Sequence, residues 1–190
     1  MDKSEVRSIY LRKRGELSPE ELRLLSIKVQ ESFVLTPEFK DARSIALYSS
    51  FRGEVLTGLI AERARRAGKG LAYPKVMGHN PPHLAFFMVD GPDELVPGAY
   101  GIMEPGQEAQ LSGEADVRGF DCIVVPGVAF DIFGLRLGYG KGFYDRQLSG
   151  ARATIVALSY DRQVMEEALP FDSHDVKMDV LVTEKEVLRF

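Results

Sequence analysis

The chain has 190 residues, 45% hydrophobic and 27% charged, which is the composition of a globular protein with one well-buried domain. A formal net charge of −4 argues against a nucleic-acid partner held by bulk electrostatics, although it leaves room for a local basic pocket. The sequence has no apolar stretch near the roughly 18 residues of a membrane span and no signal-like N-terminus, so we expect a cytoplasmic protein without a membrane partner. The single cysteine, Cys122, lies in an apolar run and is expected to be a core residue in a reducing compartment.

Hydrophobic periodicity predicts helices that alternate with strands along the chain. The second helix opens on a capping box at Ser18, with proline at its first position. The predicted helices cover residues 3–14, 19–34, 55–67, 143–148 and 163–169. The predicted strands cover residues 44–48, 71–76, 83–89, 120–125, 153–158 and 179–183.

Strands that alternate with helices favour a mostly parallel sheet with helices on both faces. The strand at 83–89 follows a turn and is expected to pair antiparallel with the strand before it. We therefore expect residues 1–190 to form a single α/β domain, a Rossmann-like three-layer sandwich with an antiparallel addition.

A glycine-rich loop follows the apolar strand that ends at Val125 and leads into the helix at 143–148. Glycines accept positive φ and add no side-chain bulk, so successive backbone N–H groups can converge on an anion. Two cations, Arg136 and Lys141, lie among the glycines, and a helix N-terminus follows them. This order predicts a phosphate-binding loop. Its glycines are residues 127, 134, 138, 140 and 142.

The loop matches neither common nucleotide-binding motif. A Walker loop would need glycine at Leu135 and Ser or Thr at Gly142, and a dinucleotide fingerprint would need glycine at Phe143. On the glycines alone, a structural turn with solvated Arg and Lys is an equal alternative. The ordered set of charged and aromatic residues favours a phosphate-binding loop over a structural turn. That set is Asp131, Arg136, Lys141 and Phe143-Tyr144-Asp145-Arg146.

The stretch PGVAFDIFGLRLGYGKGFYD, residues 126–145, resembles the signature of the 5-formyltetrahydrofolate cyclo-ligase (methenyltetrahydrofolate synthetase) family. YPKV at 73–76, GIMEP at 101–105 and the run 169–184 resemble further blocks of the family in the same order. The resemblance covers nearly the whole chain.

The resemblance implies an ATP-dependent, irreversible cyclisation of 5-formyltetrahydrofolate to 5,10-methenyltetrahydrofolate, with release of ADP and phosphate. In this reaction the formyl oxygen attacks the γ-phosphoryl group of MgATP, and a second folate nitrogen then attacks the imidate phosphate. Such a transfer needs positioning and charge neutralisation rather than a protein nucleophile. The implied partners are small molecules, reduced folate and ATP, with Mg²⁺ as the metal. The implied catalytic residues are Lys141 and Arg136.

Lys3 and Arg7, four residues apart in the first helix, match the family's Lys and Arg that approach the ATP phosphates. Without the resemblance, these two and Arg14 would be predicted as a solvated basic face. Tyr139 stands where the family often has Arg or Met, so its individual contact is not carried over. The implied ATP-binding residues are Lys3, Arg7, Arg136, Gly138, Tyr139, Gly140, Lys141, Gly142 and Phe143.

Ser49 and Glu54, after the first strand, match family positions that contact the folate, and ligands of such sheets bind beyond the carboxyl ends of strands. Glu54 by itself would be predicted as a first-turn acid that complements a helix dipole, and both roles are compatible. Phe143 replaces the commoner Tyr and keeps a ring for stacking on the pterin, so a hydrogen-bonding role falls to Tyr144. Weaker pocket candidates, for which a structural role is an equal alternative, are Lys75, Tyr100 and Glu104.

Two acids, Asp145 and Asp175, match the family's metal-contacting positions. Mg²⁺ bound to a nucleotide takes only one or two protein carboxylates, and phosphate oxygens and water complete its shell. Without the resemblance, Asp145 would be a first-turn helix acid and Asp175 a loop acid. His174 is expected to orient this loop rather than to bind the metal.

Two other functions stay open. An enzyme with a related sheet, acting on a phosphorylated sugar or a thioester, would use a similar loop without ATP. A non-catalytic relative would lose the loop cations or the metal acids, whereas Arg136, Lys141, Asp145 and Asp175 are all present.

Overall fold

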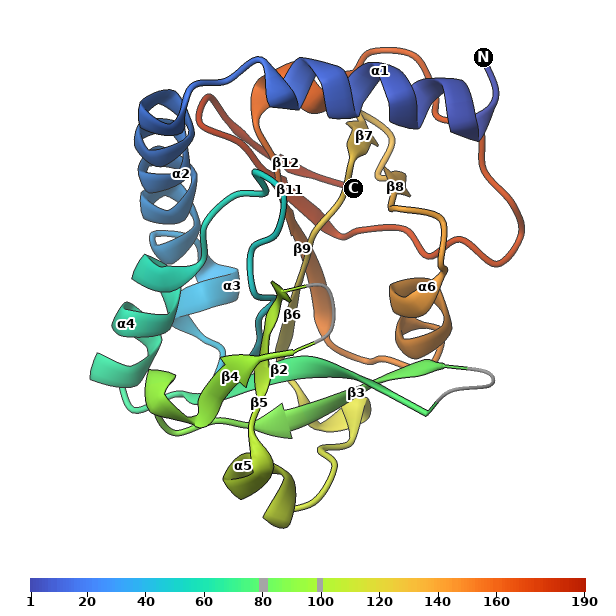
Figure 1. Ribbon diagram of the computed structural model, residues 1–190. Helices are drawn as coiled ribbons and strands as arrows, with labels where there is room; N and C mark the ends of the chain where they lie inside the picture. The colour runs from blue at the N-terminus through green and yellow to red at the C-terminus, as the bar shows by residue number, and fades with distance from the viewer. Residues whose placement is uncertain (79–81, 99–100) are drawn as a thin grey trace.

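The computed structural model describes residues 1–78, 82–98 and 101–190. A seven-stranded sheet in the order β12-β11-β9-β6-β1-β2-β3 forms its centre (Figure 1). All neighbouring strands are parallel except the two edge strands, β3 and β12, which are antiparallel to their neighbours. The strands are β1 (Ser44–Ala46), β2 (Gly70–Met77), β3 (His83–Met88), β6 (Cys122–Val125), β9 (Thr154–Leu158), β11 (Val180–Val182) and β12 (Val187–Arg189).

Helices cover both faces of this sheet (Figure 1). Because alternate strand residues point to opposite faces, Val124 packs on one side and Ile123 on the other. The Val124 side is covered by α2 (Pro19–Val34), α3 (Pro37–Lys40) and α4 (Gly58–Arg66), and the Ile123 side by α6 (Phe143–Leu148). The predicted three-layer α/β fold, with its mostly parallel sheet and antiparallel addition, is confirmed.

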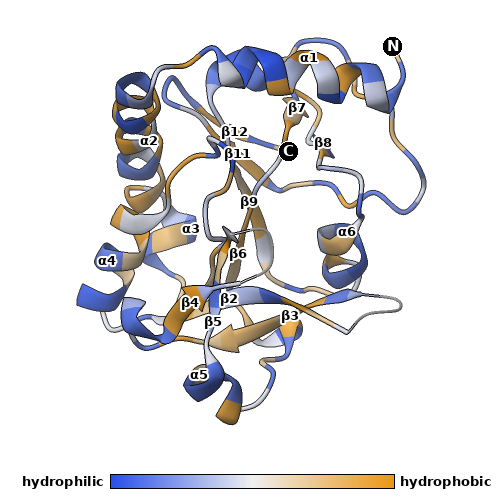
Figure 2. Ribbon diagram, viewed as in Figure 1, coloured by the Kyte–Doolittle hydropathy of each residue, from blue (hydrophilic) through white to orange (hydrophobic). Residues whose placement is uncertain are grey.

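The capping box predicted at Ser18 is confirmed, since Ser18 accepts from the Glu21 amide and the Glu21 side chain accepts from the Ser18 amide. Along α2, hydrophobic and hydrophilic residues alternate in the way that an amphipathic helix requires (Figure 2). Cys122 is fully buried, as expected of a core residue. No helix within residues 1–78, 82–98 and 101–190 is both long and apolar enough to cross a membrane.

A second, three-stranded sheet carries the N-terminal helix α1 (Lys3–Gly15). Its strands are β7 (Ala129–Asp131), β8 (Arg136–Leu137) and β10 (Val164–Met165), in the order β10-β7-β8. Val6 and Tyr10 of α1 are buried against Val128, Leu137 and Met165. This sheet, which sequence analysis did not predict, places α1 directly over the glycine motif.

Two predicted helices differ from the structure. The prediction of a helix at 163–169 is wrong. In the structure a 3-10 turn, Asp161–Gln163, is followed by the strand β10, because the backbone of this segment pairs with β7. The helix expected at 55–67 begins only at Gly58, because Tyr48 binds the preceding segment: its hydroxyl donates to the Val55 carbonyl and its carbonyl accepts from Thr57. The irregular run after residue 94 contains the paired strands β4 (Leu95–Pro97) and β5 (Met103–Pro105) and the short helix α5 (Gln107–Leu111).

Candidate active site

A cleft of about 560 Å³ lies beyond the carboxyl ends of β1 and β6 and is bordered by α1, the glycine loop and the loop before β11. It brings together all the residues for which catalytic, ATP-binding, folate-binding or metal-binding roles were predicted. These are Lys3, Arg7, Ser49, Glu54, Arg136, Gly138, Tyr139, Gly140, Lys141, Gly142, Phe143, Tyr144, Asp145 and Asp175. These residues are far apart in the sequence. The parallel sheet brings them together, because the carboxyl ends of its strands meet at one edge.

The glycine loop contacts α1 directly. Gly140 has a φ of 95° and Gly142 a φ of 62°, values that other residues rarely adopt. Nε of Arg7 donates to the Gly138 carbonyl at 2.8 Å, and a Cβ atom at Gly140 would lie 3.3 Å from Cζ of Arg7. The glycines therefore allow a close approach between the loop backbone and this guanidinium.

Arg136 is held at the base of the loop by Asp145. Nη2 donates to Oδ1 of Asp145 at 2.8 Å, and only 3% of the Arg136 side chain is exposed. Its Nε is buried and has no hydrogen-bond partner within the described ranges. Because an unsatisfied buried N–H is costly, a bound anion that reached this atom would stabilise the site.

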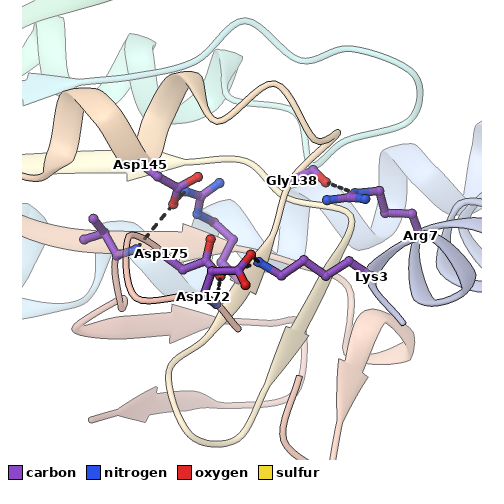
Figure 3. Close-up of polar contacts among 8 residues, drawn as sticks. Lys3, Arg7, Gly138, Asp145, Asp172 and Asp175 are labelled. Carbon is purple, nitrogen blue, oxygen red and sulfur yellow. Dashed lines mark hydrogen bonds and ion pairs between the residues drawn. The ribbon is translucent and has the colours of Figure 1, made fainter. Parts of the chain in front are cut away.

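Lys3 and two acids, Asp172 and Asp175, form a second charged cluster in the cleft (Figure 3). Nζ of Lys3 lies 2.7 Å from Oδ2 of Asp172 and 2.6 Å from Oδ2 of Asp175. Burial opposes ionisation of Asp175, but the hydrogen bonds from Lys3 and the Asp172 amide outweigh it and lower the pKa of Asp175. The Val176 amide donates to Asp145 at 3.4 Å, which ties this loop to α6.

The donor set of this cluster fits a hard divalent cation. Asp172, His174 and Asp175 each offer one ligand atom within 4.8 Å of the others, and carboxylate oxygens are the ligands that Mg²⁺ prefers. Asp172 was not predicted from the sequence. Its position only three residues before Asp175 was the signal that could have identified it.

Glu54 lines the cleft from the segment between β1 and α4. It precedes α4 by four residues, so the alternative of a first-turn acid at a helix N-terminus is wrong. Its carboxylate accepts from the Phe51 amide at 3.0 Å, and the residue as a whole is 6% exposed. Burial raises the pKa of Glu54 to about 7, and the nearby positive charge of Arg14 opposes this shift.

The basic face of α1 is not solvated, which corrects the prediction made without the resemblance. Arg14 is 2% exposed, and its guanidinium donates to the Gly127 carbonyl at 3.1 Å and to the Tyr139 hydroxyl. The Tyr139 ring in turn lies 6.4 Å from the Phe51 ring. Arg14, which no motif identified, thus connects α1 to the glycine loop.

Other predicted residues have mixed outcomes. The Ser49 hydroxyl is buried without a partner in the described residues, and it borders the cleft. Glu104 also lines the cleft, whereas Lys75 does not and instead has its Nζ 3.6 Å from the Glu104 carboxylate. Tyr100 lies outside the described residues.

Asp131 does not line the cleft. Its buried carboxylate accepts from the amides of Phe133, Leu135 and Leu169, which is a structural role.

The fold and the cleft define a three-layer α/β protein with a cationic glycine loop and a carboxylate cluster beyond the carboxyl edge of its sheet. The sequence model of the 5-formyltetrahydrofolate cyclo-ligase family matches residues 1–184. A protein of Schizosaccharomyces pombe named probable 5-formyltetrahydrofolate cyclo-ligase is 30% identical over 204 residues, covering 100% of this chain and 98% of its own length.

Two solved structures are similar over the whole fold. The NMR structure of Aquifex aeolicus 5,10-methenyltetrahydrofolate synthetase is 43% identical, with a TM-score of 0.85, and the match covers 100% of this chain and 93% of that chain. A 5,10-methenyltetrahydrofolate synthetase from Mycoplasma pneumoniae is 27% identical, with a TM-score of 0.76, and the match covers 97% and 99%. This chain belongs to the 5-formyltetrahydrofolate cyclo-ligase family. Membership indicates an enzyme with cyclo-ligase activity, and it disfavours both alternatives left open by the sequence.

Proposed function

We propose that the protein catalyses the ATP- and Mg²⁺-dependent cyclisation of 5-formyltetrahydrofolate to 5,10-methenyltetrahydrofolate, with release of ADP and phosphate. The observation that carries this proposal is that one cleft holds two sets of residues. Arg7, Arg136 and Lys141, at the glycine loop, and Ser49 and Glu54, after β1, all line it. A phosphoryl donor and its acceptor can therefore meet in one cleft, and holding them together is the main requirement of phosphoryl transfer.

The glycine loop is the proposed site of the ATP phosphates. Arg7 already lies against the loop, Arg136 keeps a free buried donor, and Lys141 adds an exposed charge. Lys3 is engaged by Asp172 and Asp175, so we propose that its contact with phosphate forms when those acids bind the cation. The proposed ATP-binding set is completed by Gly138, Tyr139, Gly140, Gly142 and Phe143.

Asp145 and Asp175 are the proposed metal ligands, with Asp172 as a further candidate. When bound, Mg²⁺ neutralises charge on the phosphate oxygens. The protein's part is to hold these carboxylates in place, Asp145 through Arg136 and the Val176 amide, Asp175 through Lys3 and the Asp172 amide.

The folate is proposed to lie between Ser49, Glu54 and the aromatic side chains of α6. Tyr144 is packed against the core and keeps its phenol neutral, because burial raises the pKa of Tyr144 far above its ordinary value. Its neutral hydroxyl can donate a hydrogen bond, whereas the Phe143 ring offers only a stacking surface.

The residues at the glycine loop act by stabilising charge. As the formyl oxygen of the substrate attacks the γ-phosphoryl group, Lys141 and Arg136 are the groups proposed to stabilise the charge on the transferring oxygens. The product of this step is the imidate phosphate of the folate, and attack by the second folate nitrogen then expels phosphate. No side chain needs to become phosphorylated.

The test is the ultraviolet absorbance of methenyltetrahydrofolate in a mixture of purified protein, 5-formyltetrahydrofolate, ATP and Mg²⁺. We expect product only when all components are present, with one ADP formed for each product molecule. Removal of Mg²⁺ with a chelator should stop the reaction, and excess Mg²⁺ should restore it. Product formation without ATP would contradict the proposal.

Gly140→Ala is expected to weaken ATP binding by about tenfold. The new Cβ would require a strained backbone at φ 95° and would press on the Arg7 guanidinium, and strain of this kind costs about 1–3 kcal/mol. Isothermal titration with ATP and Mg²⁺ measures the effect. Gly150→Ala is the matched control, because a Cβ there meets nothing within 4 Å, and equal affinities for the two variants would contradict the expectation.

We also propose that residues 1–190 act as one domain, since strands from Ser44 to Arg189 share one sheet. A cytoplasmic setting, with reduced folate and ATP as small-molecule partners and no nucleic-acid or membrane partner, is part of the same proposal. The buried free thiol of Cys122 is in keeping with a reducing compartment.

A further inference from the structure

The carboxylates that line the cleft differ in their partners. Four of the five are in ion pairs, and these pairs are Asp145–Arg136, Asp172–Lys3, Asp175–Lys3 and Glu104–Lys75. Glu54 is the fifth, and no Lys, Arg or His nitrogen of the described residues lies within 4.0 Å of its carboxylate. In the same residues its side chain has one hydrogen bond, from the Phe51 amide. Among the described residues, Glu54 is therefore the cleft carboxylate whose ionised form is not stabilised by an adjacent cation.

The backbone around Glu54 is held in a fixed geometry. Arg52 has a φ of 47°, which is unusual for a residue other than glycine, and Gly53 follows with a φ of 78°. The Glu54 amide donates to the Phe51 carbonyl at 3.1 Å, and the Tyr160 hydroxyl lies 3.4 Å from the Glu54 carbonyl. Backbone strain that persists because its surroundings enforce it is typical of functional positions. Glu54 lines the cleft, and the hydrogen bond from the Phe51 amide holds its carboxylate in place in the absence of a ligand.

The surroundings of Glu54 allow it to exchange a proton near neutral pH. Arg14 of α1 supplies a positive charge at longer range, which keeps the pKa of Glu54 from rising beyond about 7. The other titratable groups that face it are tyrosines, whose pKa values are all raised, so that they stay neutral. They are Tyr48, Tyr139, Tyr144 and Tyr160.

The cyclisation requires a proton acceptor. Nitrogen N10 of 5-formyltetrahydrofolate carries a hydrogen, whereas N10 of the 5,10-methenyl product does not. Attack by the N10 lone pair on the formyl carbon of the imidate phosphate forms the new C–N bond and leaves a positive charge on N10. That charge must be removed before the C–O bond to phosphate breaks and the N5–C–N10 amidinium forms.

We propose that Glu54 is a catalytic residue that accepts the N10 proton during ring closure. The inference rests on the proposed function, of which it specifies the second step. The electron pair of the N10–H bond stays on N10, the proton passes to the Glu54 carboxylate, and phosphate leaves with the electrons of the C–O bond. The proton is then returned to solvent after product release, so that each turnover is balanced without a further reactant.

Glu54→Gln separates the two steps of the reaction. The amide keeps the size of the side chain and an oxygen that can accept from the Phe51 amide, but it cannot accept a proton, and general-base catalysis is worth about 10²–10⁴ in rate. In a single turnover at saturating folate, ADP formation measured by rapid quench should stay within about threefold of wild type. The rise of methenyl absorbance should slow by about 10²-fold or more.

The pH dependence provides a second readout. In wild type, the ring-closure rate should rise with pH through about 7, because Glu54 must be deprotonated to accept a proton. This rising limb of the pH–rate profile should be absent from Glu54→Gln. It should be present in Glu54→Asp, which keeps a carboxylate on a shorter side chain. Glu104→Gln is the matched control: it also changes a buried cleft carboxylate, but one paired with Lys75, and it should keep the limb.

The outcomes distinguish this inference from the proposed function. If wild type forms no methenyl product with ATP and Mg²⁺, the proposed function itself fails. If wild type is active and Glu54→Gln slows ADP and product formation equally, or keeps the pH limb, only the role of Glu54 is overturned. Should Glu54→Gln not fold, Glu54→Asp decides, since loss of the limb in that variant contradicts the inference.

Discussion

Lys141→Ala is expected to lower kcat for methenyl product by about 10²–10³, the usual cost of removing one group that stabilises transition-state charge. The Lys141 side chain is exposed, and within the described ranges it makes no ion pair, although it lines the cleft between Gly140 and Gly142. Its charge is therefore available to a phosphoryl group rather than committed to the fold. The free energy of unfolding should change by no more than about 0.5 kcal/mol, as for most surface substitutions.

The measurement is steady-state kinetics beside urea unfolding of the same preparations. Lys28→Ala is the control, since it removes an equal charge from an exposed position on α2 outside the cleft. Lys141→Arg should recover part of the rate because it restores a cation of different geometry. A kcat of Lys141→Ala within twofold of wild type would contradict the catalytic role of this lysine.

Asp131→Ala is expected to lower the free energy of unfolding by about 3–5 kcal/mol, the range for a broken buried polar network. The Asp131 side chain is fully buried and accepts from the Leu135 amide at 2.8 Å, the Leu169 amide at 2.8 Å and the Phe133 amide at 3.0 Å. Alanine would leave buried amide donors without a partner. The loop between β7 and β8 and the segment before Pro170 would lose their common anchor.

Urea unfolding followed by circular dichroism tests this expectation. Asp116→Ala is the matched control, because Asp116 is exposed and its ion pair with Arg118 is solvated, so it should cost well under about 1 kcal/mol. If Asp131→Ala were as stable as this control but inactive, Asp131 would belong to the catalytic machinery after all.

Six of the seven strands of the main sheet were predictable because their determinants are local, whereas the three-residue edge strand β12 was not predicted. Strands such as Cys122–Val125 are apolar on both faces and alternate with amphipathic helices, and this order restricts the sheet to a mostly parallel topology. The small sheet under α1 was not predictable. Its strands are two or three residues long, and β10 pairs with β7 more than thirty residues away, so the pattern within each segment carries too little information.

The candidate site was predicted residue by residue from a motif, but its connections were not. Sequence spacing placed Lys3, Arg7 and Arg14 on one helix face and could not determine what that face contacts. The structure shows Lys3 on an acid cluster, Arg7 on the Gly138 carbonyl and Arg14 buried beside Tyr139. Similarly, Asp131 and Asp145 were both predicted as functional acids from the same motif, and only burial and partners separate their roles.

By itself, the sequence determined six of the seven strands of the main sheet, most of the helices that cover it, the glycine loop and the identity of its charged residues. These depend on periodicity, capping and backbone freedom, which act within a few residues. Only the tertiary structure decided which carboxylates of the cleft are paired with cations and which one, Glu54, is not. The physical reason is that the charge state of a buried group is set by desolvation and by neighbours that come from distant segments.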